Sequence, residues 1–189
     1  MTLSRFAAFI VAVMTAIAVI PLSPAPATAK ETAAKTTQGK VLVLEDWFRG
    51  RTTARGSFFN AIDGSRRDLV VDLVGTWDKR TQTLTLVEDF FYSDGERDRK
   101  TWRFTKTGPG TYVGRREDVI GTAKIFTDGA GKIRLQYKAM IGGRALAFDD
   151  TLALRTDGTV LNTASVSYLF LSVGRVELVF NRGGRKAAS

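Results

Sequence analysis

The sequence of 189 residues contains no cysteine and no histidine. Without cysteine the chain has no disulfide, no thiolate metal site, no cysteine nucleophile and no lipid-bearing N-terminal cysteine. Without histidine it lacks the most common general base, every serine–histidine–aspartate arrangement and the most common metal ligand. A glycine-rich phosphate loop is also missing, and we expect no cofactor. Carboxylates, lysine, tyrosine and serine remain for chemistry.

Residues 1–29 have the three parts of a secretory signal peptide. Arg5 supplies the positive start, residues 6–20 form an apolar run, and Ala27-Thr28-Ala29 is a small-x-small cleavage site. The run is shorter than the roughly 18 residues of a membrane-spanning helix. We therefore expect cleavage before Lys30 and export to the periplasm, with an uncleaved membrane anchor as the alternative.

The rest of the chain is predicted to hold one domain. Residues 30–39 are polar and indicate a flexible leader, residues 40–182 a single globular domain, and residues 183–189 a basic tail. The formal net charge is +9. Because export makes nucleic acid an improbable partner, this charge favours anionic lipid head groups, acidic polysaccharide or an anionic small ligand.

Segments bounded by turn residues predict an all-β fold. The ten expected strands are 41–48, 53–62, 68–77, 83–93, 99–107, 111–127, 132–141, 144–155, 159–171 and 175–181. Their short connections exclude parallel crossovers, so the sheet is predicted to be an antiparallel up-and-down meander. Such a sheet closes into a lipocalin-like barrel with room for a small ligand. The alternative fold is a β-sandwich.

The turns predict two chemically different ends of this barrel. Asp-Gly pairs at residues 63–64, 94–95, 128–129 and 157–158 mark one end, provided that residues 111–127 form one long strand. If two strands form there, the last two Asp-Gly turns move to the other end. With one long strand the rim opposite the Asp-Gly turns is basic, and we expect it to be the mouth or to face an anionic membrane; with two strands this polarity is lost. The residues of this basic rim are Arg49, Arg51, Lys79, Arg80, Arg144 and Arg175.

Glu88 is the most unusual residue of the predicted strands. It shares the parity of Leu84, Leu86, Phe90 and Tyr92, so it should face the interior with them. A turn that pairs Tyr92 with residue 100 would set Glu88 opposite residue 104. A buried carboxyl must be paired or protonated. A functional Glu88 would orient a ligand or act as an acid inside a cavity. A structural Glu88 would form an ion pair with an arginine of another strand.

Further candidate residues accompany Glu88. Asp118 lies in the middle of the long predicted strand, where small residues follow it; it marks either space for a ligand or a bulge. The hypothetical ligand-binding set is Glu88, Phe90, Tyr92, Trp102, Tyr112 and Asp118. We expect no metal site, because the acids at 94, 96 and 98 alternate with basic residues.

An ordered series of motifs resembles a known family. The motifs are Gly75-Thr76-Trp77, Glu88-Asp89-Phe90, Tyr92-Ser93-Asp94-Gly95, Thr101-Trp102-Arg103, Gly110-Thr111-Tyr112 and Asp118-Val119-Ile120-Gly121-Thr122-Ala123. They resemble the uncharacterised proteobacterial domain-of-unknown-function family 3833, over about residues 41–180. The resemblance implies a bacterial envelope protein. It supplies no activity and no catalytic residues, and the lipocalin comparison is an analogy of architecture.

These observations lead to one principal hypothesis and two alternatives. The principal hypothesis is a non-enzymatic barrel that binds an apolar or amphipathic ligand, which could be lipid-derived and anionic. A cavity of roughly 300 Å³ or more would favour it. The first alternative is an envelope interaction protein with a filled core. The second is a hydrolase that works through Glu88 and Asp118.

Overall fold

The computed structural model describes residues 41–183. The predicted signal peptide, the predicted leader and residues 184–189 of the predicted tail lie outside the described residues. Among residues 41–183, no helix is long and apolar enough to cross a membrane.

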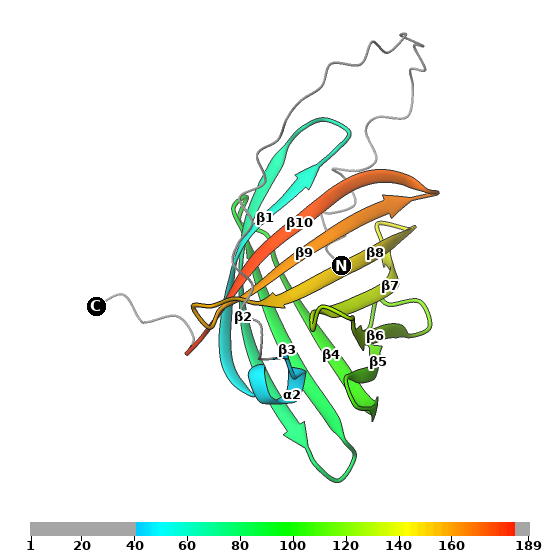
Figure 1. The fold of residues 1–189 in the computed structure, drawn as a ribbon. Coiled ribbons are helices and arrows are strands. Elements are labelled where there is room, and N and C mark those ends of the chain that lie inside the picture. The colour runs from blue at the N-terminus through cyan, green and yellow to red at the C-terminus, as the bar shows by residue number, and fades with distance from the viewer. Residues whose placement is uncertain (1–40, 184–189) are drawn as a thin grey trace, which may run out of the picture.

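Ten antiparallel strands form a closed barrel (Figure 1). Each strand pairs with its neighbours in sequence, and β1 also pairs with β10, which closes the sheet. The elements are α2 (Leu44–Trp47), β1 (Gly50–Asn60), β2 (Arg66–Asp78), β3 (Thr83–Tyr92), β4 (Arg97–Gly108), β5 (Thr111–Arg115), β6 (Ala123–Thr127), β7 (Ile133–Ile141), β8 (Arg144–Leu154), β9 (Val160–Tyr168) and β10 (Leu171–Arg182). The predicted barrel is confirmed, and the sandwich alternative is wrong.

Alternating side chains form the wall of the barrel. In β2, Leu69, Val71 and Leu73 are buried, while Asp72 and Val74 between and after them face outward. This period of two is the signal that the sequence carries for a strand with one buried face. The buried face of β2 therefore lines the interior of the barrel.

The first predicted strand is wrong. Residues 41–48 contain the short helix α2 instead, and Leu44, Trp47 and Phe48 are buried against the barrel interior. Their spacing of three and four residues places them on one helical face. The helix lies at one end of the barrel, in front of β2 and β3 and above the turn that joins them in Figure 1. We call this end the helix end and the opposite one the far end.

The long strand predicted over residues 111–127 is also wrong, because β5 and β6 are separate. The loop between them turns at Gly121, whose φ of +72° is accessible to glycine without strain. The loop runs along β7: Val119 bridges Ala139, and Met140 donates its backbone N–H to the Asp118 carbonyl at 2.8 Å. This additional reversal changes which turns lie at which end.

Candidate functional site

A cavity of about 250 Å³ occupies the barrel interior. Side chains from α2 and from every strand except β5 line it. At the helix end it stops on Leu44 and Phe48. At the far end it reaches Gly142 and Met140, and Met140 is 48% exposed. Because apolar side chains close the helix end and Gly142 is exposed, we place the opening of the cavity at the far end, beside the β7–β8 turn.

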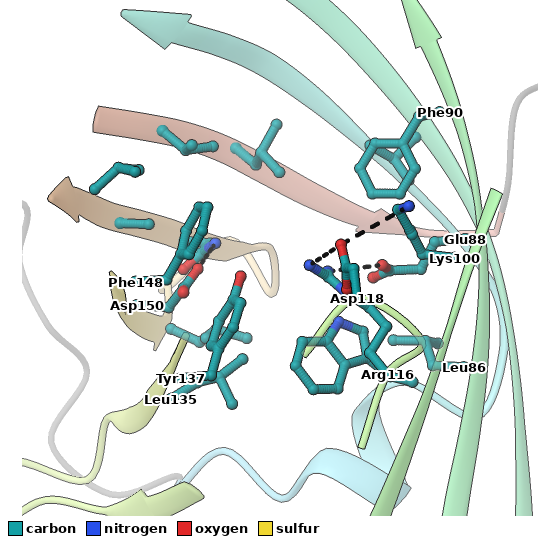
Figure 2. A pocket seen from close by; sticks show the side chains of 18 of the residues that line it. Leu86, Glu88, Phe90, Lys100, Arg116, Asp118, Leu135, Tyr137, Phe148 and Asp150 are labelled. Atoms are coloured by element: carbon teal, nitrogen blue, oxygen red, sulfur yellow. Dashed lines mark hydrogen bonds and ion pairs between the residues drawn. The ribbon is translucent and has the colours of Figure 1, made fainter. Parts of the chain in front are cut away.

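A polar cluster lies within these largely apolar walls. It consists of Glu88, Lys100, Arg116, Asp118, Asp150 and Asn162, which come from β3, β4, the β5–β6 loop, β8 and β9. Figure 2 shows Arg116, Asp118, Glu88 and Lys100 together, with Asp150 beside Tyr137 and Phe148 across the cavity.

Both bases of the polar cluster are bound by carboxylates. The Arg116 Nε and Nη2 atoms donate to the two oxygens of Asp118 at 2.7 and 3.2 Å. Lys100 Nζ lies 3.2 Å from an Asp98 oxygen and 3.8 Å from an Asp118 oxygen. The Arg116 guanidinium also lies over the Trp102 ring, 4.6 Å from its centroid. A bidentate ion pair and an aromatic face fix the arginine in position.

Glu88 differs from the other carboxyls of the polar cluster, because no hydrogen bond from residues 41–183 reaches it. It is 9% exposed, and its oxygen lies 4.0 Å from Arg116 Nη1, beyond hydrogen-bonding distance. Burial raises the pKa of Glu88 to about 7; the Arg116 charge opposes this effect, while Asp150, Asp118 and Glu117 add to it. The Glu88 carboxyl lines the cavity, and with this pKa it is partly protonated near neutral pH.

Asp150 and Asn162 form a second polar pair across the cavity. The Asn162 amide donates to Asp150 Oδ1 at 2.8 Å. The other oxygens, Asp150 Oδ2 and Asn162 Oδ1, are buried and have no hydrogen-bond partner among residues 41–183. Burial raises the pKa of Asp150 to about 6, although Asn162 and Arg116 act in the opposite direction. Unpartnered buried acceptors are rare in folded proteins and need an explanation.

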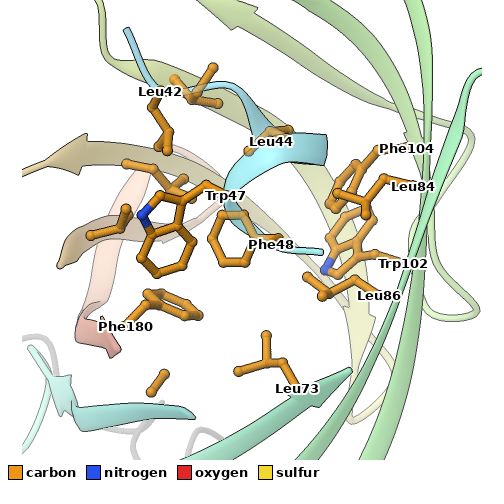
Figure 3. Packing of buried hydrophobic residues seen from close by; sticks show 14 of the residues in the cluster. Leu42, Leu44, Trp47, Phe48, Leu73, Leu84, Leu86, Trp102, Phe104 and Phe180 are labelled. Atoms are coloured by element: carbon orange, nitrogen blue, oxygen red, sulfur yellow. The ribbon is translucent and has the colours of Figure 1, made fainter. Parts of the chain in front are cut away.

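The helix end is filled with apolar side chains, as Figure 3 shows. Phe48 contacts Trp47 and Phe180 edge to face, with ring centroids 4.6 and 5.5 Å apart. Leu73 and Leu84 complete the same cluster. This packing ends the cavity at the level of the helix and leaves the far end as its exit.

The structure brings most of the predicted ligand-binding residues together. Glu88, Phe90, Tyr92, Trp102 and Asp118 all line the cavity. Their role in binding stays a prediction. Tyr112 does not line the cavity: its hydroxyl donates to Glu45 of α2 at 2.5 Å, and it anchors the helix.

The predicted register of β3 against β4 is wrong, although the predicted inward face of Glu88 is confirmed. Glu88 pairs with Lys100, and Phe90 pairs with Asp98. An even shift of register keeps every side chain on its face, so the alternation alone could not decide it.

The predicted basic rim is wrong as a single feature. Arg49, Arg51, Lys79 and Arg80 lie at the helix end, near α2 and the β2–β3 turn, whereas Arg144 and Arg175 lie toward the far end. The extra reversal between β5 and β6 causes this division. The mouth is at the far end, so most of the predicted basic rim is at the opposite end from it.

The sequence analysis missed Arg116, Asp150 and Asn162. The alternation that found Glu88 could have found Asp150, because Leu146 and Leu152 share its parity and are also buried. Asn162 lies between buried Val160 and Ala164 in the same way. No local signal marks Arg116, because a loop side chain has no alternating pattern around it.

Fold and cavity together define a ten-stranded antiparallel barrel of lipocalin-like architecture. The chain belongs to the family described as "Protein of unknown function (DUF3833)", whose sequence profile matches residues 25–182. Among solved structures it is similar to an S-type phycobiliprotein lyase from Guillardia theta, with a TM-score of 0.55 and 10% identity. That match covers 77% of this chain and 92% of the lyase. The comparison with curated proteins found no match.

Proposed function

We propose that the barrel binds a small amphipathic molecule in its cavity and does not transform it. The observation that carries this proposal is a largely apolar cavity that contains buried polar atoms with no hydrogen-bond partner among residues 41–183. Ligand sites of proteins have this composition: mostly apolar walls with a few polar groups that fix the orientation of the ligand.

The size of the cavity limits the ligand. Its volume of about 250 Å³ is slightly below the roughly 300 Å³ at which drug-sized pockets begin. The ligand is therefore compact, or part of it extends through the mouth beside Met140 and Gly142.

The contacts of Asp118 favour binding over hydrolysis. A carboxylate pair that cleaves a glycosidic bond needs one partner free to act as nucleophile or base. Asp118 is held by Arg116 and contacts Lys100, so it does not have that freedom. The similar solved structure is named a lyase, but at 10% identity the likeness concerns the fold alone.

Titration calorimetry with decanol and its shorter and longer homologues tests the proposal. Ala164→Leu adds volume to a buried wall position of the cavity and should abolish binding. Ala145→Leu makes the same change at an exposed position and should leave binding intact. Circular dichroism checks that both variants fold. Binding that survives Ala164→Leu contradicts the cavity as the site.

A membrane surface is the partner that we propose for the far end. The exposed large apolar residues that gather in its turns are Ile62, Ile120, Met140, Leu169, Phe170 and Leu171. Phe170 is fully exposed, and it and Leu169 have positive φ values of 71° and 46°. A conformation unfavourable for these residues, with their side chains in solvent, needs a compensating contact. Leu169 and Phe170 form the turn between β9 and β10. Arg144 and Arg175 lie toward the same end of the barrel, and their charges suit anionic head groups.

Co-sedimentation with vesicles that contain anionic lipid tests this partner. Replacing Leu169, Phe170 and Leu171 with serine should abolish sedimentation. Replacing Val41 and Val74 with serine should leave sedimentation unchanged, because these exposed residues do not lie in the turns of the far end. If neither variant loses binding, the net charge of the protein accounts for it and the far end is not the membrane contact.

Export to the periplasm is a separate proposal that rests on the signal-peptide pattern of residues 1–29. The intact mass of the protein recovered from the periplasm should correspond to a chain that begins at Lys30. A membrane-bound chain that retains residues 1–29 would indicate an anchor.

A further inference from the structure

The bases of the polar cluster are already engaged by carboxylates of the protein. Arg116 gives two donors to Asp118 and stacks on Trp102, and Lys100 contacts Asp98 and Asp118. An anionic head group would add a further negative charge beside Glu88, Asp98, Asp118 and Asp150, which already outnumber these two bases.

Acceptors, in contrast, are left over. The Glu88 carboxyl receives no hydrogen bond from residues 41–183. Asp150 Oδ2 and Asn162 Oδ1 are buried without a partner, and both residues line the cavity. Asp150 is 6% exposed and Asn162 is 7% exposed. All these atoms are acceptors when the carboxyls are ionised, so their complement is a donor.

The charged side chains that line the cavity also favour a cationic donor, because more of them are acidic than basic. The charged side chains that line it are Glu88 on β3, Asp98 and Lys100 on β4, Arg116 and Asp118 in the β5–β6 loop, and Asp150 on β8. Carboxyls therefore outnumber bases inside a protein whose net charge is +9. An excess of buried acid must protonate or acquire a cation. Burial is the main cause of the raised pKa values of Glu88 and Asp150, and for Glu88 the charges of Asp150, Asp118 and Glu117 add to it.

We infer that the ligand carries a cationic, hydrogen-bond-donating head group of the ammonium type, which Glu88, Asp150 and Asn162 hold inside the cavity. This inference rests on the proposed function, in which the cavity binds a small amphipathic molecule. It departs from the anionic ligand that the overall charge suggested. The apolar walls accept the remainder of the molecule, and the surface charge of the barrel takes no part in selecting the head group.

Binding of such a head group is linked to protons. A cation favours the ionised carboxyls, so its affinity rises as the pH increases through the range in which Glu88 and Asp150 lose their protons. A neutral head group of the same chain length should show little of this dependence. An anionic one should bind more weakly as the pH rises.

Titration calorimetry of the full chain with decylamine, decanol and decanoate tests the inference. Near pH 8 decylamine should bind at least about tenfold more tightly than decanoate, because one head group pairs with the acids and the other is repelled. Its affinity should fall about tenfold on acidification to about pH 5.5. Glu88→Gln and Asp150→Asn should each weaken decylamine by about tenfold and change decanol by less than about threefold. Asp89→Asn, next to Glu88 but on the outer face, is the matched control.

The outcomes separate the inference from the function on which it rests. If none of the three probes binds, the proposed function fails. If decanoate binds most tightly, the function stands and the inference is overturned. If decylamine binds most tightly but neither substitution nor pH affects it, the head group lies elsewhere and the inference is also overturned. Since Glu88→Gln should leave packing intact, it decides the question even if Asp150→Asn does not fold.

Discussion

Replacing Glu88 with glutamine removes a charge that the barrel interior holds at a cost in stability. The folded state raises the pKa of this carboxyl from 4.5 to about 7, mainly through burial. It therefore binds the proton more tightly than the unfolded chain does. The contribution of Glu88 to the free energy of unfolding is then greatest below pH 4.5 and falls as the pH rises toward 7. Across that window the loss amounts to about 3 kcal/mol.

Glu88→Gln should therefore be more stable than the wild type near pH 8, by up to about 3 kcal/mol, and nearly equal to it near pH 4. Urea unfolding at both pH values measures the difference, and unchanged m-values show that the unfolding reaction is the same. The matched control is Asp89→Asn. Its exposed ion pair with Arg99 should be worth less than about 1 kcal/mol. A Glu88→Gln variant that is less stable near pH 8 would refute the reasoning and make Glu88 a structural partner of Arg116.

Three further substitutions test the fold. Asp118→Asn leaves the Arg116 guanidinium buried without its bidentate partner, and urea melts should show a loss of about 3–5 kcal/mol. Gly75→Ala places a methyl group on the Phe48 carbonyl, so the chain after α2 must move, and the melting temperature should fall steeply. Glu45→Gln weakens the short bonds that α2 receives from β4 and β5; faster hydrogen exchange at residues 44–48, with the barrel strands unchanged, would show that the helix end loosens selectively.

The inward position of Glu88 was predictable because strand alternation is a local property. Successive side chains point to opposite faces, so a carboxyl among Leu84, Leu86 and Phe90 must face the core whatever the register is. The same argument predicts Asp150. The register itself depends on the turn, and the four residues between β3 and β4 pair Glu88 with Lys100. A pattern with period two cannot distinguish registers that differ by an even number.

The helix α2 was not predictable in this way. Residues 41–48 are apolar enough for either a strand or a helix, and a four-residue helix has no stability of its own. The open end of a barrel provides the apolar surface against which Leu44, Trp47 and Phe48 pack. The barrel still has ten strands, because the predicted strand lost at residues 41–48 is replaced when residues 111–127 divide into β5 and β6.

By itself the sequence determined an antiparallel β fold of about ten strands and the faces of those strands, because alternation and short turns act within a few residues. Its motifs also indicated the family of the chain. Only the tertiary structure decided which turns share an end, where the cavity opens and how Arg116 is held. Those features depend on contacts between residues far apart in the chain, such as Arg116 over Trp102 and Met140 against the β5–β6 loop. One additional reversal at residues 116–122 places every later turn at the end opposite to the predicted one. In an up-and-down barrel each strand runs antiparallel to the one before it, so one extra strand reverses the direction of all that follow.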